Sequence, residues 1–303
     1  MVGSRKIGIA AVSVLVIAIA AGMFFWMKTR VPAGSLTDGL VTQSDTPPVV
    51  ENGQAGAVAL PAVADEHPLD PALRLAREAL EKFQREVTDY TATMIKRERI
   101  SGTLGGETRM EAKIRTRQVE ADKLVRPMSV YLKVLDPWLA RGREVIWVED
   151  RNDGKLLAHE GGLKNLIHVS LAPTDRLAMM GNKYPITEIG LAKLMEKLIE
   201  KGERDKQVGP CEVTIRSGAE VAGRLCQLIE VKHPERDARF DFYIAQIYLD
   251  AERMIPLRYA AYLWPDSPDA APPLEEEYTY VDVRLNVGLT DADFDPTNSA
   301  YQY

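Results

Sequence analysis

Histidine and cysteine are scarce in this chain of 303 residues, with four and two copies. No two of the histidines, at positions 67, 159, 168 and 233, are four residues apart with a glutamate between them, as the helical zinc motif requires. The sequence also lacks the Gly-x-Ser-x-Gly turn of hydrolases, the phosphate loop and the dinucleotide-binding glycine pattern. It therefore predicts a protein that is not an enzyme and that has no cofactor and no metal site. A hydrolase built from scattered Asp and Glu remains an alternative, which ranks second to a non-enzymatic alternative.

One acidic run has the alternation of a calcium loop without its essential positions. Asp291–Asp295 places carboxylates at every second residue. Pro296 stands where that loop requires Gly, and Gln302 stands where it requires a bidentate Glu. We expect these carboxylates to cap a short turn.

A surplus of basic residues is absent as well. The net charge is -6, and the first thirty residues hold four basic and no acidic side chains, so the other 273 residues carry -10. Proteins that bind nucleic acid neutralise its phosphates with an excess of Lys and Arg. The charge balance therefore excludes nucleic acid as a partner.

What the sequence does contain is one long uncharged run, Ile7–Met27. As a helix it would extend roughly 31 Å, which is enough to cross the core of a bilayer. The alternative is a signal peptide cleaved after Ala18-Ile19-Ala20, although the apolar region of such a peptide usually has only ~7–15 residues. We predict a membrane anchor over residues 1–30.

Residues 31–67 differ in composition from everything that follows. They are rich in Pro, Gly, Ala, Ser and Thr and contain no aromatic residue. Such a segment buries too little apolar surface to offset the entropy lost on ordering. We predict a flexible tether here and a folded domain over residues 68–303.

The segment Glu107–Arg117 separates its residue types by alternate positions. Every odd position is charged, whereas the even positions are Thr, Met, Ala, Ile and Thr. Neighbouring side chains of a strand point to opposite faces, while a helical period would scatter these charges around its surface. The pattern predicts a strand in an antiparallel sheet with one charged, solvated face and one apolar face.

The remaining periodicity predicts helices and many short strands. Amphipathic helices are expected from Asp70, as N-cap, to Val87 and over Thr187–Lys201. Alternating segments bounded by turn residues predict the strands Tyr90–Ile100, Met128–Val134, Glu144–Glu149, Lys155–Glu160, Cys211–Arg216, Leu225–Lys232, Arg239–Asp250, Pro256–Trp264 and Glu275–Leu285. This order predicts the α+β class, with helices on one face of a long sheet.

The two cysteines lie on strands expected to form a hairpin. If Gly218-Ala219 is its loop, Cys211 and Cys226 face each other within disulfide reach. An export-type N-terminus favours an oxidising compartment and hence the bond. The alternative is a pair of buried free thiols.

Several phrases carry a resemblance to a known family. DYTATMIKRERISG, PMSVYLKVLDP, GREVIWVEDRNDGKLLAH, YLDAERMIPLRY and EEEYTYVDVRLNVGLTDADFD resemble an uncharacterised family of bacterial cell-envelope proteins, over residues 69–303. That family is similar in architecture to the LolA-type periplasmic lipoprotein carriers. The resemblance implies a strongly curved antiparallel sheet, an open half-barrel with helices over its concave face, and acyl chains held inside. Those carriers are soluble, whereas the uncharged run predicts an anchor here, so we expect a single-pass protein of the bacterial inner membrane with its domain in the periplasm.

The apolar strand face and the second helix together suggest a cavity. We expect it to be lined by Met110, Ile114, Met128, Val130, Leu132, Trp147, Leu194, Met195 and Leu198. The predicted function is binding or transfer of a lipid or lipoprotein by its acyl chains at the inner membrane. The first alternative is an envelope sensor or protein-interaction module with a closed core, no ligand and an envelope protein as partner.

Overall fold

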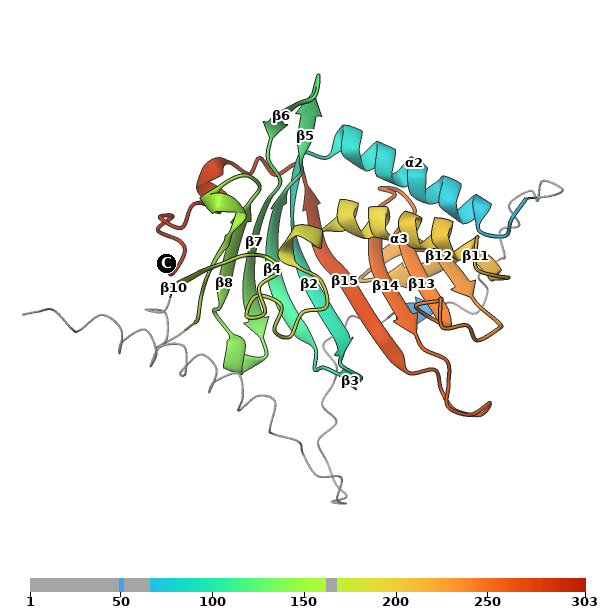
Figure 1. Cartoon of the computed structure of the whole chain (residues 1–303). Helices are drawn as coiled ribbons and strands as arrows, with labels where there is room; N and C mark the ends of the chain where they lie inside the picture. Colours follow the sequence, from blue (N-terminus) through green and yellow to red (C-terminus); the bar gives the residue numbers. More distant parts are fainter. Residues whose placement is uncertain (1–48, 52–65, 162–167) are drawn as a thin grey trace, which may run out of the picture. The chain divides into compact units, whose positions relative to one another are not determined.

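The computed structural model of the chain describes residues 49–51, 66–161 and 168–303 (Figure 1). The predicted anchor, residues 7–27, lies outside these ranges. In the described part of the chain no helix has both the length and the apolar character needed to cross a membrane.

Most strands of the described residues form one antiparallel sheet of thirteen, in which two meanders are joined side by side (Figure 1). The first meander consists of β2 (Asp89–Ile100), β4 (Thr108–Arg115), β7 (Ser129–Asp136), β8 (Glu144–Val148), β9 (Leu156–His159) and β10 (His168–Leu171). The second consists of β11 (Glu212–Val221), β12 (Arg224–Lys232), β13 (Ile244–Asp250), β14 (Pro256–Tyr262) and β15 (Leu274–Leu285). Pairing of β15 with β2 joins them. The short strand β3 (Thr103–Leu104) pairs with β2, and β5 (Gln118–Glu120) and β6 (Lys123–Arg126) form a separate hairpin.

Two α-helices of the described chain lie against the same face of the sheet (Figure 1). Helix α2 (Asp70–Glu86) precedes the first meander, and α3 (Leu191–Asp205) lies in the segment that connects the two meanders. The helices pack against each other, and α3 contacts β14. The predicted class, α+β with helices on one face of a long antiparallel sheet, is confirmed.

The alternation of Glu107–Arg117 is confirmed in β4. Met110, Ala112 and Ile114 are buried in the core beneath the helices. The opposite, charged face is partly covered rather than fully solvated, because the C-terminal segment that includes η5 (Asp291–Phe294) lies on it. Lys113 there contacts Asp293, and Tyr131 stacks on Tyr301 with ring centroids 4.2 Å apart. Thr290 and Asp293 form a capping box, so the acidic run does cap a short turn.

The second helix starts later than predicted. Thr187 lies in the short 3-10 turn η4 (Ile186–Glu188), and α3 begins only after Gly190. Gly190 has φ +116°, a backbone conformation that ends the preceding turn and that other residues rarely adopt. The first N–H of the helix, from Leu191, donates to the Tyr90 hydroxyl at 2.8 Å.

The prediction that residues 31–67 lack structure is wrong at one point. Residues Val49–Glu51 form β1, which pairs antiparallel with β11 at the edge of the sheet. Backbone hydrogen bonding to a sheet edge needs no apolar composition, so composition alone does not reveal it. The rest of the segment up to residue 65 is outside the described ranges.

The predicted disulfide between Cys211 and Cys226 is also wrong. The β11–β12 hairpin turns at Ala222-Gly223, not at Gly218-Ala219, because both turn residues adopt positive φ. Cys226 therefore lies opposite Ala219, while Cys211 precedes β11 at the far end of the hairpin. Both thiols are free and buried.

Candidate functional site

The strand residues predicted to line a cavity belong to the packed core. They lie on the helix-facing side of β4, β7 and β8, with Met128 directly before β7, and are at most 8 % exposed: Met110, Ile114, Met128, Val130, Leu132 and Trp147. Ile186, Leu191 and Met195, the last of which is also predicted to line the cavity, belong to the same core cluster. Two of the nine predicted residues, Leu194 and Leu198, do line a hollow.

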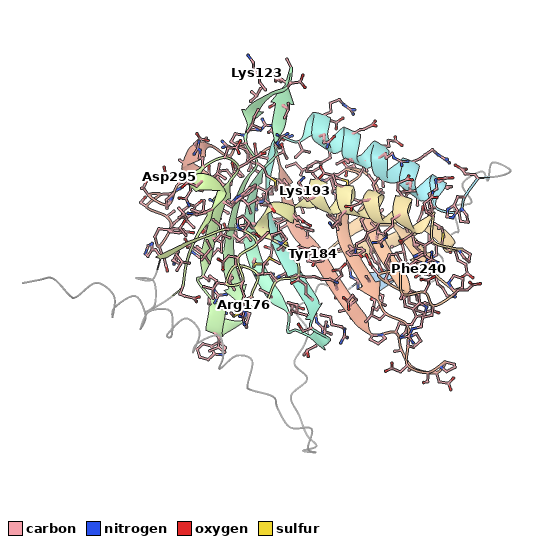
Figure 2. All side chains as sticks on the ribbon, in the orientation of Figure 1. Lys123, Arg176, Tyr184, Lys193, Phe240 and Asp295 are labelled. Atoms are coloured by element: carbon pink, nitrogen blue, oxygen red, sulfur yellow. The ribbon has the colours of Figure 1, made fainter. Side chains whose placement is uncertain are left out.

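That hollow lies beneath α3 and has a volume of about 240 Å³. On the sheet side it is lined by residues of β2, β14 and β15: Met94, Lys96, Glu98, Tyr259, Tyr278 and Tyr280. Leu194 and Leu198 of α3, with Ile189, add further apolar surface. Tyr184 and Lys193, both labelled in Figure 2, also belong to its lining.

A smaller pocket of about 80 Å³ lies between α2, α3 and the strands β12 and β13. Its lining is almost entirely apolar: Leu69, Ala72, Leu73, Ala76, Ile229, Val231, Phe242, Ala245 and Ile247. Leu198 and Lys201 line both this pocket and the hollow. These two side chains therefore lie at the junction of the two spaces, of which one has a mixed lining and the other an apolar lining.

Two buried carboxylates hold the polar side chains that line the hollow, and the first, Glu98 of β2, is itself part of the lining. It accepts hydrogen bonds from the Lys96 ammonium at 2.6 Å and the Tyr278 hydroxyl at 2.5 Å. The backbone N–H of Lys183 donates to it at 3.2 Å. Lys96 also donates to the Asn182 side chain at 2.8 Å, which joins the strand to the segment before α3.

The second carboxylate, Glu276 of β15, is 1 % exposed and has four partners. The ammonium groups of Lys183 and Lys201 lie 2.9 and 3.4 Å from its oxygens. The Tyr184 and Tyr259 hydroxyls donate to it at 3.0 and 3.2 Å. Glu276 on β15 thus binds Tyr259 from the neighbouring strand β14 and three side chains from the segment between β10 and β11.

Burial and neighbouring charges move the pKa values of Glu276, Lys183, Tyr184 and Tyr278 away from neutral pH. Burial alone would raise the pKa of Glu276, but Lys201 and Lys183 outweigh it, and the pKa lies below its ordinary value. Burial would lower the pKa of Lys183, yet Glu276 and Glu275 raise it overall. Burial and the nearby carboxylates raise the pKa values of Tyr184 and Tyr278. A general acid or base needs a pKa near the working pH, so these four groups suit binding rather than proton transfer.

Three successive glutamates, Glu275–Glu277, at the start of a strand would ordinarily be solvated, but the structure buries Glu276. Alternate positions of the same strand, Glu276, Tyr278 and Tyr280, share one face. The same rule groups Met94, Lys96 and Glu98 on β2. Alternation alone reveals the shared face, but the partners that allow a buried charge come from distant segments of the chain.

Comparisons with known proteins identify similar folds and the family of the chain. A search of curated proteins finds no match. The structure is similar to an outer-membrane lipoprotein-sorting protein domain from Vibrio parahaemolyticus, with 15 % identity, TM-score 0.34 and coverage of 74 % of this chain and 95 % of that one. A LolA superfamily protein from Nitrosomonas europaea has 12 % identity and TM-score 0.27, and the match covers 73 % of this chain and 97 % of that one. The MucA/MucB complex of Pseudomonas aeruginosa has 16 % identity and TM-score 0.42, and the match covers 74 % of this chain and 60 % of that one. The model of the protein family of unknown function DUF1571 matches residues 87–303, and the chain therefore belongs to that family.

Proposed function

We propose that this domain binds an acyl chain of a lipid or lipoprotein in the hollow beneath α3. The observation that carries the proposal is the junction at Leu198, a side chain that lines both the hollow and an apolar pocket. A ligand placed across this junction would have its apolar end between the two helices and the sheet. Its polar end would lie among the tyrosines and lysines of the larger space.

The energetic argument needs only hydrocarbon burial. Each buried methylene contributes about 0.8 kcal/mol, so a short stretch of acyl chain supplies useful affinity without a charged contact. The most direct reading of this site is a carrier or receiver of acylated molecules at the cell envelope. Anchoring by residues 7–27 and a periplasmic location are part of the same proposal.

The proposed ligand site differs from the one expected from sequence. The predicted strand residues of β4, β7 and β8 form a closed core, and the ligand space instead lies over β2, β14 and β15. Leu194 and Leu198, two of the residues predicted from sequence, are part of the proposed site.

A second candidate function is a protein-interaction module. Trp138 and Leu139 in η1 (Trp138–Ala140) are 75 % and 57 % exposed at the end of the β7–β8 hairpin. Exposed aromatic and aliphatic residues of this kind are typical of contact sites. A partner bound there would not contact the residues that line the hollow through these two side chains.

Native mass spectrometry of the full chain, extracted from membranes under mild conditions, tests the acyl proposal. We expect bound lipid, identified after organic extraction. Leu198→Trp should close the junction and reduce the bound fraction at least tenfold. Leu225→Trp, on an exposed position of β12, is the matched control and should retain lipid.

A lipid-free wild-type protein with no affinity for a labelled fatty acid or monoacylglycerol would contradict the proposal. Equal lipid retention by Leu198→Trp, with an unchanged melting temperature, would place the ligand elsewhere. Loss of lipid by both Trp variants would point to unfolding, which circular dichroism detects.

A further inference from the structure

The charges that line the hollow beneath α3 cancel. Four lysines and four glutamates line it: Lys96, Lys193, Lys197, Lys201, Glu98, Glu188, Glu196 and Glu200. Each has an opposite charge within ion-pair distance. The pairs on α3 are half-exposed, whereas the Lys96–Glu98 pair at 2.6 Å is buried on the sheet side.

The buried pairs lack a spare cation for an anionic ligand. Lys96 already contacts Glu98 and Asn182, and Lys201 contacts Glu276 and Asp241. An anion that enters must leave water and compete for these ammonium groups, which would leave a buried carboxylate unpaired. Both steps are costly in a buried site.

Hydrogen-bond acceptors, in contrast, are in surplus. The hydroxyls of Tyr184, Tyr259 and Tyr278 all donate to Glu98 or Glu276. A hydroxyl that has donated its hydrogen still has oxygen lone pairs that accept. The wall therefore suits a ligand group that donates hydrogen bonds and has no net charge.

We infer that the polar end of the hollow selects an uncharged head group that carries hydroxyls or amide N–H groups, on an acyl chain that extends toward the apolar pocket. This inference rests on the proposed function and names its ligand class. A fatty acid anion or a quaternary ammonium amphiphile of the same chain length binds more weakly.

Chain-matched amphiphiles test this preference. The full chain, held in an amphipathic polymer, is titrated with monolauroylglycerol, laurate and dodecyltrimethylammonium against a fluorescent acyl probe, with polymer alone as blank. We expect monolauroylglycerol to displace the probe at least tenfold better than either charged ligand. Laurate that binds equally well or better overturns the inference and leaves acyl binding intact. If none of the three binds, the proposed function fails and this inference fails with it.

Glu98→Gln tests the cause of the preference. It leaves Lys96 without its carboxylate, so the preference should shift toward laurate by about tenfold. The charge-neutral double variant Glu98→Gln with Lys96→Gln should restore the preference for monolauroylglycerol. Glu252→Gln, on an exposed side chain paired with Arg224, is the control and should not alter the ratio.

An unchanged ratio in a folded Glu98→Gln protein would contradict the role of the Lys96–Glu98 pair. If circular dichroism shows that the single variant is unfolded, the comparison of the three ligands on the unmodified chain decides the inference alone.

Discussion

Glu98 and Glu276 lie directly opposite each other on the paired strands β2 and β15, and both are buried on the face that the helices cover. Like charges in opposed positions of a sheet destabilise it, and burial increases the cost. Lys96, Lys183 and Lys201 offset this cost. The arrangement couples the junction of the two meanders to the segment that carries α3.

Glu276→Gln should destabilise the domain. Removing one partner of a buried ion pair typically costs 3–5 kcal/mol, and we expect about 3 kcal/mol because Lys183 keeps Glu275 and Lys201 keeps Asp241. Urea unfolding followed by circular dichroism measures the loss. Glu252→Gln is the exposed control, and a stability of Glu276→Gln equal to that control would show that the network contributes nothing.

The acid stability of the domain should depend on the same carboxylate. The pKa of Glu276 is lower in the folded chain than its ordinary 4.5. The unfolded chain therefore binds more protons, and the stabilisation present above pH 4.5 is lost as pH falls through the folded pKa. The urea midpoint should decline below pH 4.5, and Glu276→Gln should make that decline shallower. Identical acid profiles for the two proteins would contradict this assignment.

Alternation is sufficient to predict the sheet and one of its faces. In Glu107–Arg117 the charged residues stand at odd positions and the uncharged residues at even positions. The strand and its apolar face therefore follow from local geometry alone. The class of the fold follows from the order of such segments. Strand ends are less accurate, because turn residues such as Ala222-Gly223 depend on backbone conformations that composition does not show.

The position of the hollow cannot be predicted in the same way. It depends on which part of the apolar face the connecting segment covers, and Ile186, Leu191 and Met195 cover β4 and its neighbours. The burial of Glu276 escapes prediction for a related reason. Its charge is compatible with burial only because Lys183 and Lys201, some 75 to 93 residues earlier in the chain, reach it.

The two cysteines should behave as unreactive thiols in the folded chain. Burial raises the pKa of Cys211 to about 11 and that of Cys226 to about 12, so little thiolate forms at pH 8. A thiol reagent should label neither quickly in buffer and both in guanidinium without reductant. Mass spectrometry counts the labels, and a pre-reduced sample is the control. Labelling that requires reductant would show a disulfide and contradict the free thiols.

Gly190→Ala should disturb the start of α3 and the hollow together. Gly190 has φ +116°, and a β-carbon there would lie 2.9 Å from the Tyr90 hydroxyl and 3.3 Å from Ile114. A backbone conformation restricted to glycine costs other residues about 1–3 kcal/mol. The clash would also displace the Tyr90 hydroxyl and weaken the hydrogen bond that it accepts from the Leu191 N–H.

Gly181→Ala is the matched control, because Gly181 also has positive φ but a β-carbon on it would meet no other atom within 4 Å. We expect Gly190→Ala to lose about 1 kcal/mol more than Gly181→Ala in urea unfolding, a margin comparable to one hydrogen bond. Since Gly190 lines the hollow, the same variant should also bind the acyl probe more weakly, whereas equal stability and binding in the two variants would show that the contact with Tyr90 does not position α3.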